Sequence, residues 1–110
     1  MRIVYICHPI SGDIYQNHLK VRKIIRDLNM SNPDIVPFAP YLIDLLCMDD
    51  CIPEERARGI RNDEALFRAK FIDEVWLYGD RISIGMQHEI ELANELGIPV
   101  ISKSDKIKLK

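Results

Sequence analysis

Short apolar runs alternate along the chain with longer segments in which apolar residues recur every three or four positions. The short runs are rich in β-branched and aromatic residues and predict strands at residues 2–7, 35–38, 74–78 and 98–101. The longer segments predict a helix between Asp13 and the break at Asn32-Pro33, and further helices at residues 41–48, 53–70 and 85–96.

Strands that alternate with helices predict an α/β fold with a parallel sheet and right-handed crossovers. We expect one domain over residues 1–110: a flavodoxin- or Rossmann-like three-layer sandwich with about four to five strands in the order 2-1-3-4. Pro37 cannot donate a hydrogen bond to a neighbouring strand, so the second strand is predicted at an edge. The lysine-rich tail, residues 102–110, is predicted to be frayed and solvated.

This strand order places a ligand crevice beyond the carboxyl ends of the first and third strands. The loops at that edge, residues 8–12 and 79–85, are rich in glycine and serine. Ser83 is the predicted N-cap of the last helix, and Gly85 would let a ligand approach its first turn. The backbone N–H groups of this helix start and of the Ser11-Gly12 loop suit a phosphate group.

Two acids lie on the core-facing sides of predicted helices. Glu89 shares the inward stripe of Met86 and Ala93, and Asp63 is three residues from Leu66. Because a carboxylate is rarely fully buried without a partner, the spacing leaves two interpretations open: an acid that leans out to solvent, or a site. If both acids converge on one cleft, one could act as nucleophile and the other as proton donor at a glycosidic bond.

Composition narrows the classes of function. With a net charge of −2, the chain has no excess of positive charge that would attract nucleic acid phosphates. No apolar run approaches the length of a membrane span. No signal peptide is expected, because the first apolar run is short and predicts a strand. Cys7 is predicted in the core, and Cys47 and Cys51 lack a second ligand pair for zinc. No Walker or dinucleotide-binding glycine motif occurs. We expect a cytoplasmic protein with no metal, cofactor, membrane or nucleic acid partner.

A set of short motifs runs through nearly the whole chain. They are the segment from Val4 to Asp13 with Asn17, Pro37-Phe38-Ala39-Pro40, Asp49-Asp50 with Pro53-Glu54-Glu55-Arg56, Asn62-Asp63, and Trp76 through Glu89 with its Ser83-x-Gly85-x-x-x-Glu89 pattern. Together they resemble the nucleoside 2-deoxyribosyltransferase superfamily over residues 2–101. The chain is most similar to an uncharacterised branch of deoxyribosyltransferase-like domains associated with phages and bacteria.

The resemblance implies three catalytic roles. Glu89 would attack C1′ of a deoxyribosyl group, Asp63 would serve the leaving base as acid, and Tyr5 would orient the nucleophile. Covalent capture divides a difficult glycosidic cleavage into two easier steps. The implied substrate-binding residues are His8, Pro9, Ile10, Ser11, Gly12, Asn17, Tyr41, Asp80, Ser83 and Gly85. Tyr41 stands where much of the branch would carry a histidine, which leaves the choice of base open.

Several residues have a structural interpretation beside the functional one. Trp76 is predicted to belong to the core rather than to a stacking platform. His88 projects from a different side of its helix than Glu89 and is predicted at the surface or an interface. Asp49-Asp50 and the run from Glu54 to Arg56 are predicted to be a solvated loop and helix start.

Two functions fit these observations. The first is an enzyme that cleaves or transfers the N-glycosidic bond of a 2′-deoxynucleoside or its 5′-monophosphate. The alternative is a non-catalytic module that senses or sequesters a nucleotide-derived small molecule. A small sheet has little wall around a substrate, so we expect at least a homodimer. Its contact surfaces are predicted on the helices at 53–70 and 85–96, with Phe67 and Met86 among the apolar residues that they carry.

Overall fold

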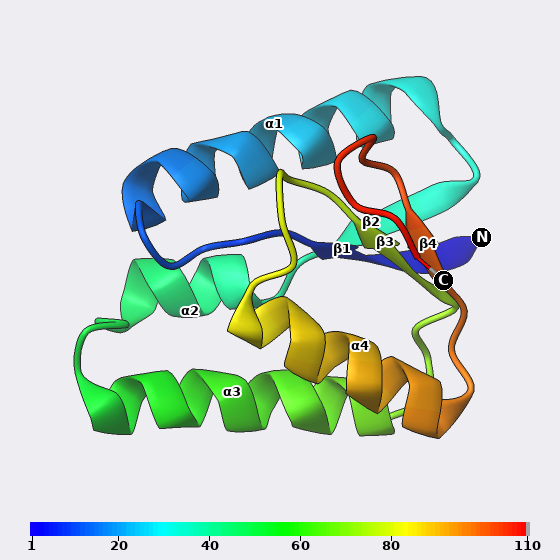
Figure 1. The fold of residues 1–110 in the computed structure, drawn as a ribbon. Helices are drawn as coiled ribbons and strands as arrows, with labels where there is room; N and C mark the ends of the chain where they lie inside the picture. The colour runs from blue at the N-terminus through cyan, green and yellow to red at the C-terminus, as the bar shows by residue number, and fades with distance from the viewer. Residues whose placement is uncertain (110) are drawn as a thin grey trace.

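Strands and helices alternate along residues 1–109, the part of the chain that this computed structural model describes (Figure 1). The strands are β1 (Arg2–Cys7), β2 (Ile35–Phe38), β3 (Glu74–Leu77) and β4 (Val100–Ser102). The helices are α1 (Ile14–Ser31), α2 (Tyr41–Cys47), α3 (Pro53–Arg68) and α4 (Ile84–Leu96). The apolar pattern therefore predicted the type and order of these elements correctly.

The four strands form one parallel sheet in the order β2-β1-β3-β4, as predicted, and the fold is flavodoxin-like. Pro37 lies on β2, which is an edge strand, as predicted. An edge strand pairs on one side only, so the sheet tolerates a residue without an N–H there. In the central pair, Tyr5 is in register with Val75 and Cys7 with Leu77. Residues two apart point to the same face, so each face of the sheet carries its own set of side chains.

The two faces are covered by different helices, with α1 on one side and α3 and α4 on the other (Figure 1). On the α1 side, Val4, Ile6 and Trp76 are buried together with Val21 of the helix. The other face buries a larger cluster, which includes Tyr5, Cys7, Phe67, Val75, Leu77, Met86, Ile90 and Ala93. Trp76 is 8% exposed, so its predicted place in the core is confirmed.

Local capping explains where α1 and α4 begin. Asp13 accepts a hydrogen bond from the backbone N–H of Gln16, and Ser83 accepts one from Met86 at 3.2 Å. Gly97 ends α4 in the left-handed region with φ 73°, and the N–H of Ile98 bonds to the Ala93 carbonyl. This C-cap uses Ile98, so β4 begins at Val100 rather than at the predicted residue 98.

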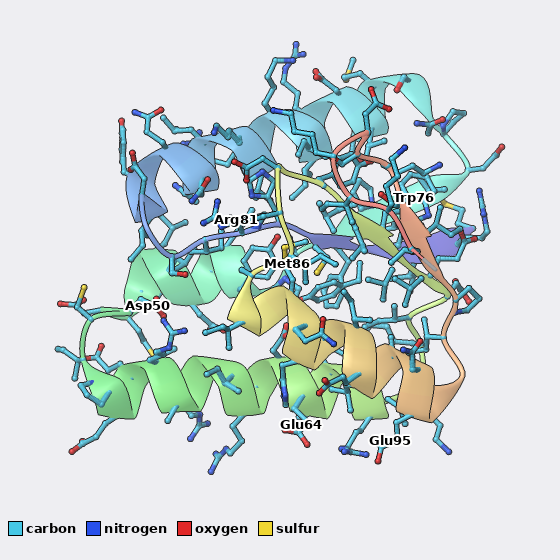
Figure 2. The ribbon with its side chains drawn as sticks, viewed as in Figure 1. Asp50, Glu64, Trp76, Arg81, Met86 and Glu95 are labelled. Atoms are coloured by element: carbon cyan, nitrogen blue, oxygen red, sulfur yellow. The ribbon has the colours of Figure 1, made fainter. Side chains whose placement is uncertain are left out.

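Phe67 and Met86 do not lie on an outer surface, and their predicted place in a subunit interface is wrong. Their side chains are 0% and 1% exposed within a single chain, because both point between the helices and the sheet. Figure 2 shows Met86 at the start of α4 on its inner side. The same view shows Glu64 and Glu95 directed outward, where both form ion pairs with Arg68.

The segment after β4 folds back on the domain as far as Ile107, so the prediction of a frayed tail from residue 102 is wrong for this part. Ile107 is 4% exposed and joins the α3–α4 side of the core. Ser104 donates to the Gly79 carbonyl, and the Lys103 ammonium lies 4.2 Å from the centre of the Trp76 ring. Lys110 lies outside the described residues.

Within residues 1–109, none of the helices combines the length and the apolar character that crossing a membrane requires.

Candidate functional site

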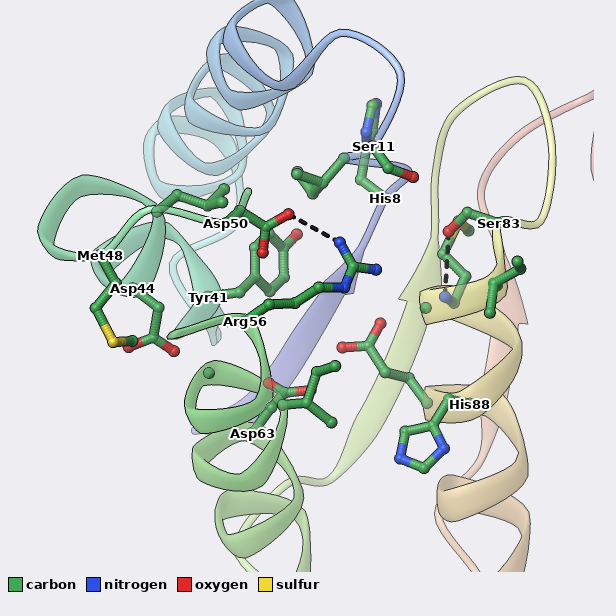
Figure 3. Close-up of a pocket in the computed structure, with 18 of the residues that line it drawn as sticks. His8, Ser11, Tyr41, Asp44, Met48, Asp50, Arg56, Asp63, Ser83 and His88 are labelled. Atoms are coloured by element: carbon green, nitrogen blue, oxygen red, sulfur yellow. Dashed lines mark hydrogen bonds and ion pairs between the residues drawn. The ribbon is translucent and has the colours of Figure 1, made fainter. Parts of the chain in front are cut away.

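A cavity of about 350 Å³ opens beyond the carboxyl ends of β1 and β3, where the strand order predicts a ligand crevice (Figure 3). Its lining comes from the loop after β1, from α2 and the loop that follows it, from one side of α3, and from the start of α4. Asp63 of α3 and Glu89 of α4 both line it. The two acids singled out by helical spacing therefore share one cavity.

Tyr5 joins the two acids on the inner side of this cavity. Its fully buried ring projects from β1, and its hydroxyl oxygen lies 2.7 Å from Asp63 Oδ1 and also hydrogen bonds with Glu89 Oε2. A phenol carries one proton, so it can donate to one carboxylate while it accepts from the other acid in its protonated form. Because both carboxyl groups contact one hydroxyl oxygen, those two carboxyl oxygens lie within about 5.5 Å of each other.

The surroundings favour the protonated forms of both acids. Burial raises the pKa of Glu89 well above its ordinary value, and the neighbouring Asp63 raises it further. Burial also raises the pKa of Asp63, although hydrogen bonds to Glu89 and Tyr5 oppose the shift. Because the two acids interact closely, the proton that they retain belongs to the pair rather than to one residue. The pKa of Tyr5 is also raised by burial, which keeps the phenol neutral.

Cys7 is a second neighbour of Glu89. The sequence predicted that Cys7 is buried in the core but not that it contacts Glu89. The prediction of burial is confirmed, and the thiol sulfur lies 3.2 Å from Glu89 Oε1. Burial raises the pKa of Cys7 well above its ordinary value, so the thiol is neutral and donates to Glu89 Oε1. A signal was available in the sequence, because Tyr5 and Cys7 are two residues apart and therefore share one face of β1.

The loop after β1 is held close to the turn that follows β3. His8 is 7% exposed, its Nδ1 lies 2.6 Å from the Pro9 carbonyl oxygen, and burial lowers its pKa. This contact places the hydrogen of the neutral imidazole on Nδ1. Gly79 has φ 100°, and a Cβ there would meet Pro9 Cδ at 2.6 Å. The close approach brings His8, Ile10 and Ser11 to the cavity wall.

The start of α4 contributes a further part of the cavity wall. Ser83 and Gly85 both line the cavity, as does Ile84, which is 90% exposed. The Ser83 hydroxyl caps the helix by accepting a hydrogen bond from the Met86 N–H. The N–H groups of Ile84 and Gly85, in the first turn, have no partner inside the helix. Ser83 and Gly85 therefore lie in the cavity wall, and the binding of an anion there stays a prediction.

Tyr41 lies in the cavity wall contributed by α2, and its position is fixed by the sheet. Its hydroxyl donates to the Ile6 carbonyl at 2.6 Å, and its ring lies 6.0 Å from that of Tyr5. The hydroxyl is therefore used within the fold, while the rest of the side chain contributes to the wall.

Four of the substrate-binding residues implied by the resemblance lie outside the cavity lining: Pro9, Gly12, Asn17 and Asp80. Asn17 instead donates its side-chain amide to the Ile10 carbonyl at 3.0 Å and so supports the loop from beneath. Asp80 forms an ion pair with Arg81, whose guanidinium also donates to the Ser11 carbonyl at 3.3 Å. These residues hold the loops that form the wall.

The acidic segment between α2 and α3 was predicted to be a solvated loop and helix start, but part of it lines the cavity. Asp50, Glu55 and Arg56 are lining residues, and Arg56 Nη1 lies 3.0 Å from Asp50 Oδ2. Asp44 of α2 also contributes. Figure 3 shows Arg56 reaching from α3 across the cavity toward Asp50. Arg56 is seven residues before Asp63, so the helical repeat could have placed both on one side of α3.

His88 is half exposed, in agreement with the predicted surface position, but it also lines the cavity. Its Nε2 lies 3.9 Å from Glu64 Oε2 across the α3–α4 gap. The described residues contain no group of three or more His, Cys, Asp or Glu side chains placed to hold a metal ion.

The chain belongs to a family of domains of unknown function, DUF7768, whose pattern matches residues 2–103. No curated protein and no solved structure matches the chain.

Proposed function

We propose that this protein is an enzyme that cleaves or transfers the N-glycosidic bond of a 2′-deoxynucleoside or its 5′-monophosphate. The observation that carries the proposal is the cluster of Tyr5, Asp63 and Glu89: both acids line the cavity, and both bond to the hydroxyl of the buried Tyr5 behind them. The resemblance to the nucleoside 2-deoxyribosyltransferase superfamily supports the same three residues.

The separation of the acids favours a covalent route. Retaining glycosidases hold their two carboxyl groups about 5–5.5 Å apart, whereas inverting enzymes need about 6.5–9.5 Å to admit a water molecule. Since Asp63 and Glu89 share the Tyr5 hydroxyl, they fall in the shorter class. One acid can therefore attack C1′ directly while the other protonates the leaving base.

In the first step, a Glu89 carboxylate oxygen forms a bond to C1′ as the bond from C1′ to the base nitrogen breaks. The bonding pair passes to the base, which takes a proton from the Asp63 carboxyl. The sugar is then held as a glycosyl ester of Glu89. In the second step, ionised Asp63 accepts a proton from an acceptor base or from water, whose nitrogen or oxygen attacks C1′ and releases Glu89. An acceptor base gives a transferase, and water gives a hydrolase.

The proton must be on Asp63 and Glu89 must be ionised before the first step, although burial favours the protonated form of both acids. The Tyr5 hydroxyl supplies a path, because Glu89 can pass its proton to the phenol oxygen as the phenol proton passes to Asp63. No phenolate forms in this exchange, in keeping with the raised pKa of Tyr5. Positive charge that develops on the sugar in the transition state then stabilises ionised Glu89.

The phosphate of a monophosphate substrate would lie against the start of α4 and the loop after β1. Ser83, Gly85 and Ser11 line this part of the cavity, and a helix N-terminus attracts anions through its unpaired N–H groups. These groups favour a nucleotide over a nucleoside as the substrate.

The test is to incubate the purified protein with a panel of deoxynucleosides and their monophosphates, with and without acceptor bases, and to measure free base by chromatography. Base release that is lost in Glu89→Ala and kept in Glu91→Gln, an exposed acid two residues along the same helix, is the expected result. Intact-protein mass spectrometry should detect a deoxyribosyl adduct that is absent from Glu89→Ala. Tight binding with neither product nor adduct would refute the enzyme and support a nucleotide-binding module.

A further inference from the structure

One end of the cavity combines apolar walls with an ion pair. Leu45, Met48 and Ile60 contribute the apolar lining, and Arg56 and Asp50 contribute the charged groups. Among the residues described, Arg56 is the one lysine or arginine in the cavity lining. Small-molecule sites commonly have this composition, with apolar surfaces for a ring and a few polar groups that fix its orientation.

Hydrogen bonds within the α2–α3 loop and the first turn of α3 hold the segment that carries Asp50. Glu55 accepts a hydrogen bond from the Asp49 N–H at 3.0 Å, and Asp49 accepts one from the Cys51 N–H at 2.9 Å. Asp50 lies between these two bonded residues, and its side chain is 22% exposed. The donor Arg56 and the acceptor Asp50 are therefore presented side by side, 3.0 Å apart, before any ligand binds.

The arrangement along α3 relates this pair to the proposed chemistry. Arg56, Ile60 and Asp63 all line the cavity from one side of the helix. Seven residues of helix span about 10.5 Å, a distance that an extended arginine side chain and a ring can bridge. If the sugar carbon lies at Glu89 and the base nitrogen at Asp63, the far edge of the base points toward Arg56 and Asp50.

On this basis, which rests on the proposed function, we propose that Arg56 and Asp50 recognise the base and select a 6-oxopurine, guanine or hypoxanthine. In a purine that leaves through N9, Asp63 would protonate N7. The next groups along that edge are the substituent at C6 and then N1. A 6-oxopurine presents an oxygen acceptor and then an N–H donor, which match the arginine donors and the carboxylate acceptor.

Adenine presents the opposite pattern on the same edge. Its 6-amino group is a donor that would face the donors of Arg56, and its bare N1 is an acceptor that would face Asp50. Each mismatch sets donor against donor or acceptor against acceptor, so the remaining donors of Arg56 and the remaining acceptor sites of Asp50 lose their contact with water and gain no partner on the base. The chemical step balances for the preferred base: the bonding electrons of C1′–N9 pass into the ring, N7 gains the Asp63 proton, and a neutral base departs.

The test compares 2′-deoxyinosine with 2′-deoxyadenosine for the wild type, Arg56→Ala, Asp50→Asn and the control Arg61→Ala. Arg61 is exposed on the same helix and does not line the cavity. The wild type should favour deoxyinosine in kcat/KM. Arg56→Ala should lose roughly 10- to 100-fold on deoxyinosine and change little on deoxyadenosine. Arg56→Lys, which keeps the charge without the planar fork, should recover only part of the loss. Arg61→Ala should match the wild type.

Equal losses on both nucleosides, or a loss confined to their monophosphates, would overturn the inference; the second result would assign Arg56 to phosphate binding. Calorimetry with free hypoxanthine and free adenine separates this inference from the proposed chemistry. Hypoxanthine should bind the wild type more tightly than adenine, and Arg56→Ala should abolish the difference. If this selectivity is present without turnover, base recognition stands and the proposed reaction is refuted. If turnover is present without selectivity, the reaction stands and the base assignment is wrong.

Discussion

Replacement of Glu89 with glutamine should remove a pH-dependent cost that the wild-type protein carries. The folded state raises the pKa of this carboxyl well above its ordinary value of 4.5, mainly through burial and then through repulsion from Asp63. Glutamine has nearly the same shape and can still accept the Tyr5 hydroxyl proton. The variant therefore keeps the fold while it removes the titrating group.

The sign follows from counting bound protons. Below the ordinary pKa of glutamate, both folded and unfolded chains hold the Glu89 proton, and the group does not affect stability. As the pH rises above that value, the unfolded chain releases the proton while the folded chain retains it, so wild-type stability falls. The fall continues until the pH reaches the raised folded-state pKa. Its slope is at most about 1.4 kcal/mol per pH unit for one proton.

The assay is urea unfolding of wild type and Glu89→Gln at several pH values between about 5 and 8, with Glu91→Gln as control. The two stability curves should be closest at the acid end, and the glutamine variant should gain relative to the wild type as the pH rises. The control should follow the wild type, because Glu91 is exposed and accepts a hydrogen bond from the neighbouring surface residue Gln87. Parallel curves for wild type and Glu89→Gln across this range would refute the buried, proton-holding acid pair. Turnover in the same variant should fall by several powers of ten, since the covalent catalyst is lost.

Three further predictions concern the acid, the loop contact and the assembly. Asp63→Asn should slow release of natural bases far more than release of an activated nitrophenyl-type leaving group, and equal losses in the rate assay would argue against proton donation. Gly79→Ala should lower the free energy of unfolding by about 2 kcal/mol or more, because Gly79 has φ 100° and the new Cβ would meet Pro9 at 2.6 Å. The control Gly97→Ala, where φ is 73° and no atom lies within 4 Å of the new Cβ, should lower it by about 1 kcal/mol in the same urea assay. Light scattering should give at least twice the 12.8 kDa of one chain, and a monomeric mass with full activity would show that one chain completes the site.

The sequence by itself determined the fold and the two acids on which the proposed chemistry depends. Strand and helix periods differ, so the apolar pattern fixed the type and order of the elements, and the alternation of strands and helices then allowed few sheet topologies. Asp63 and Glu89 were identifiable because an acid on an inward stripe conflicts with its surroundings. The switch in strand order supplied the edge at which they meet, since parallel strands bring the loops at their carboxyl ends together.

Only the tertiary structure decided which distant groups surround those acids. Cys7 touches Glu89, and the pair of Asp50 and Arg56 lines the cavity from an acidic loop and helix start whose composition is typical of solvent-exposed segments. Their positions depend on how α2 and α3 pack across the sheet, which no local period encodes. The tail shows the same limit, because a lysine-rich segment docks through one buried isoleucine, Ile107, whose partners lie far away in the sequence. Long-range contacts of this kind are set by the shape of the assembled core rather than by neighbouring residues.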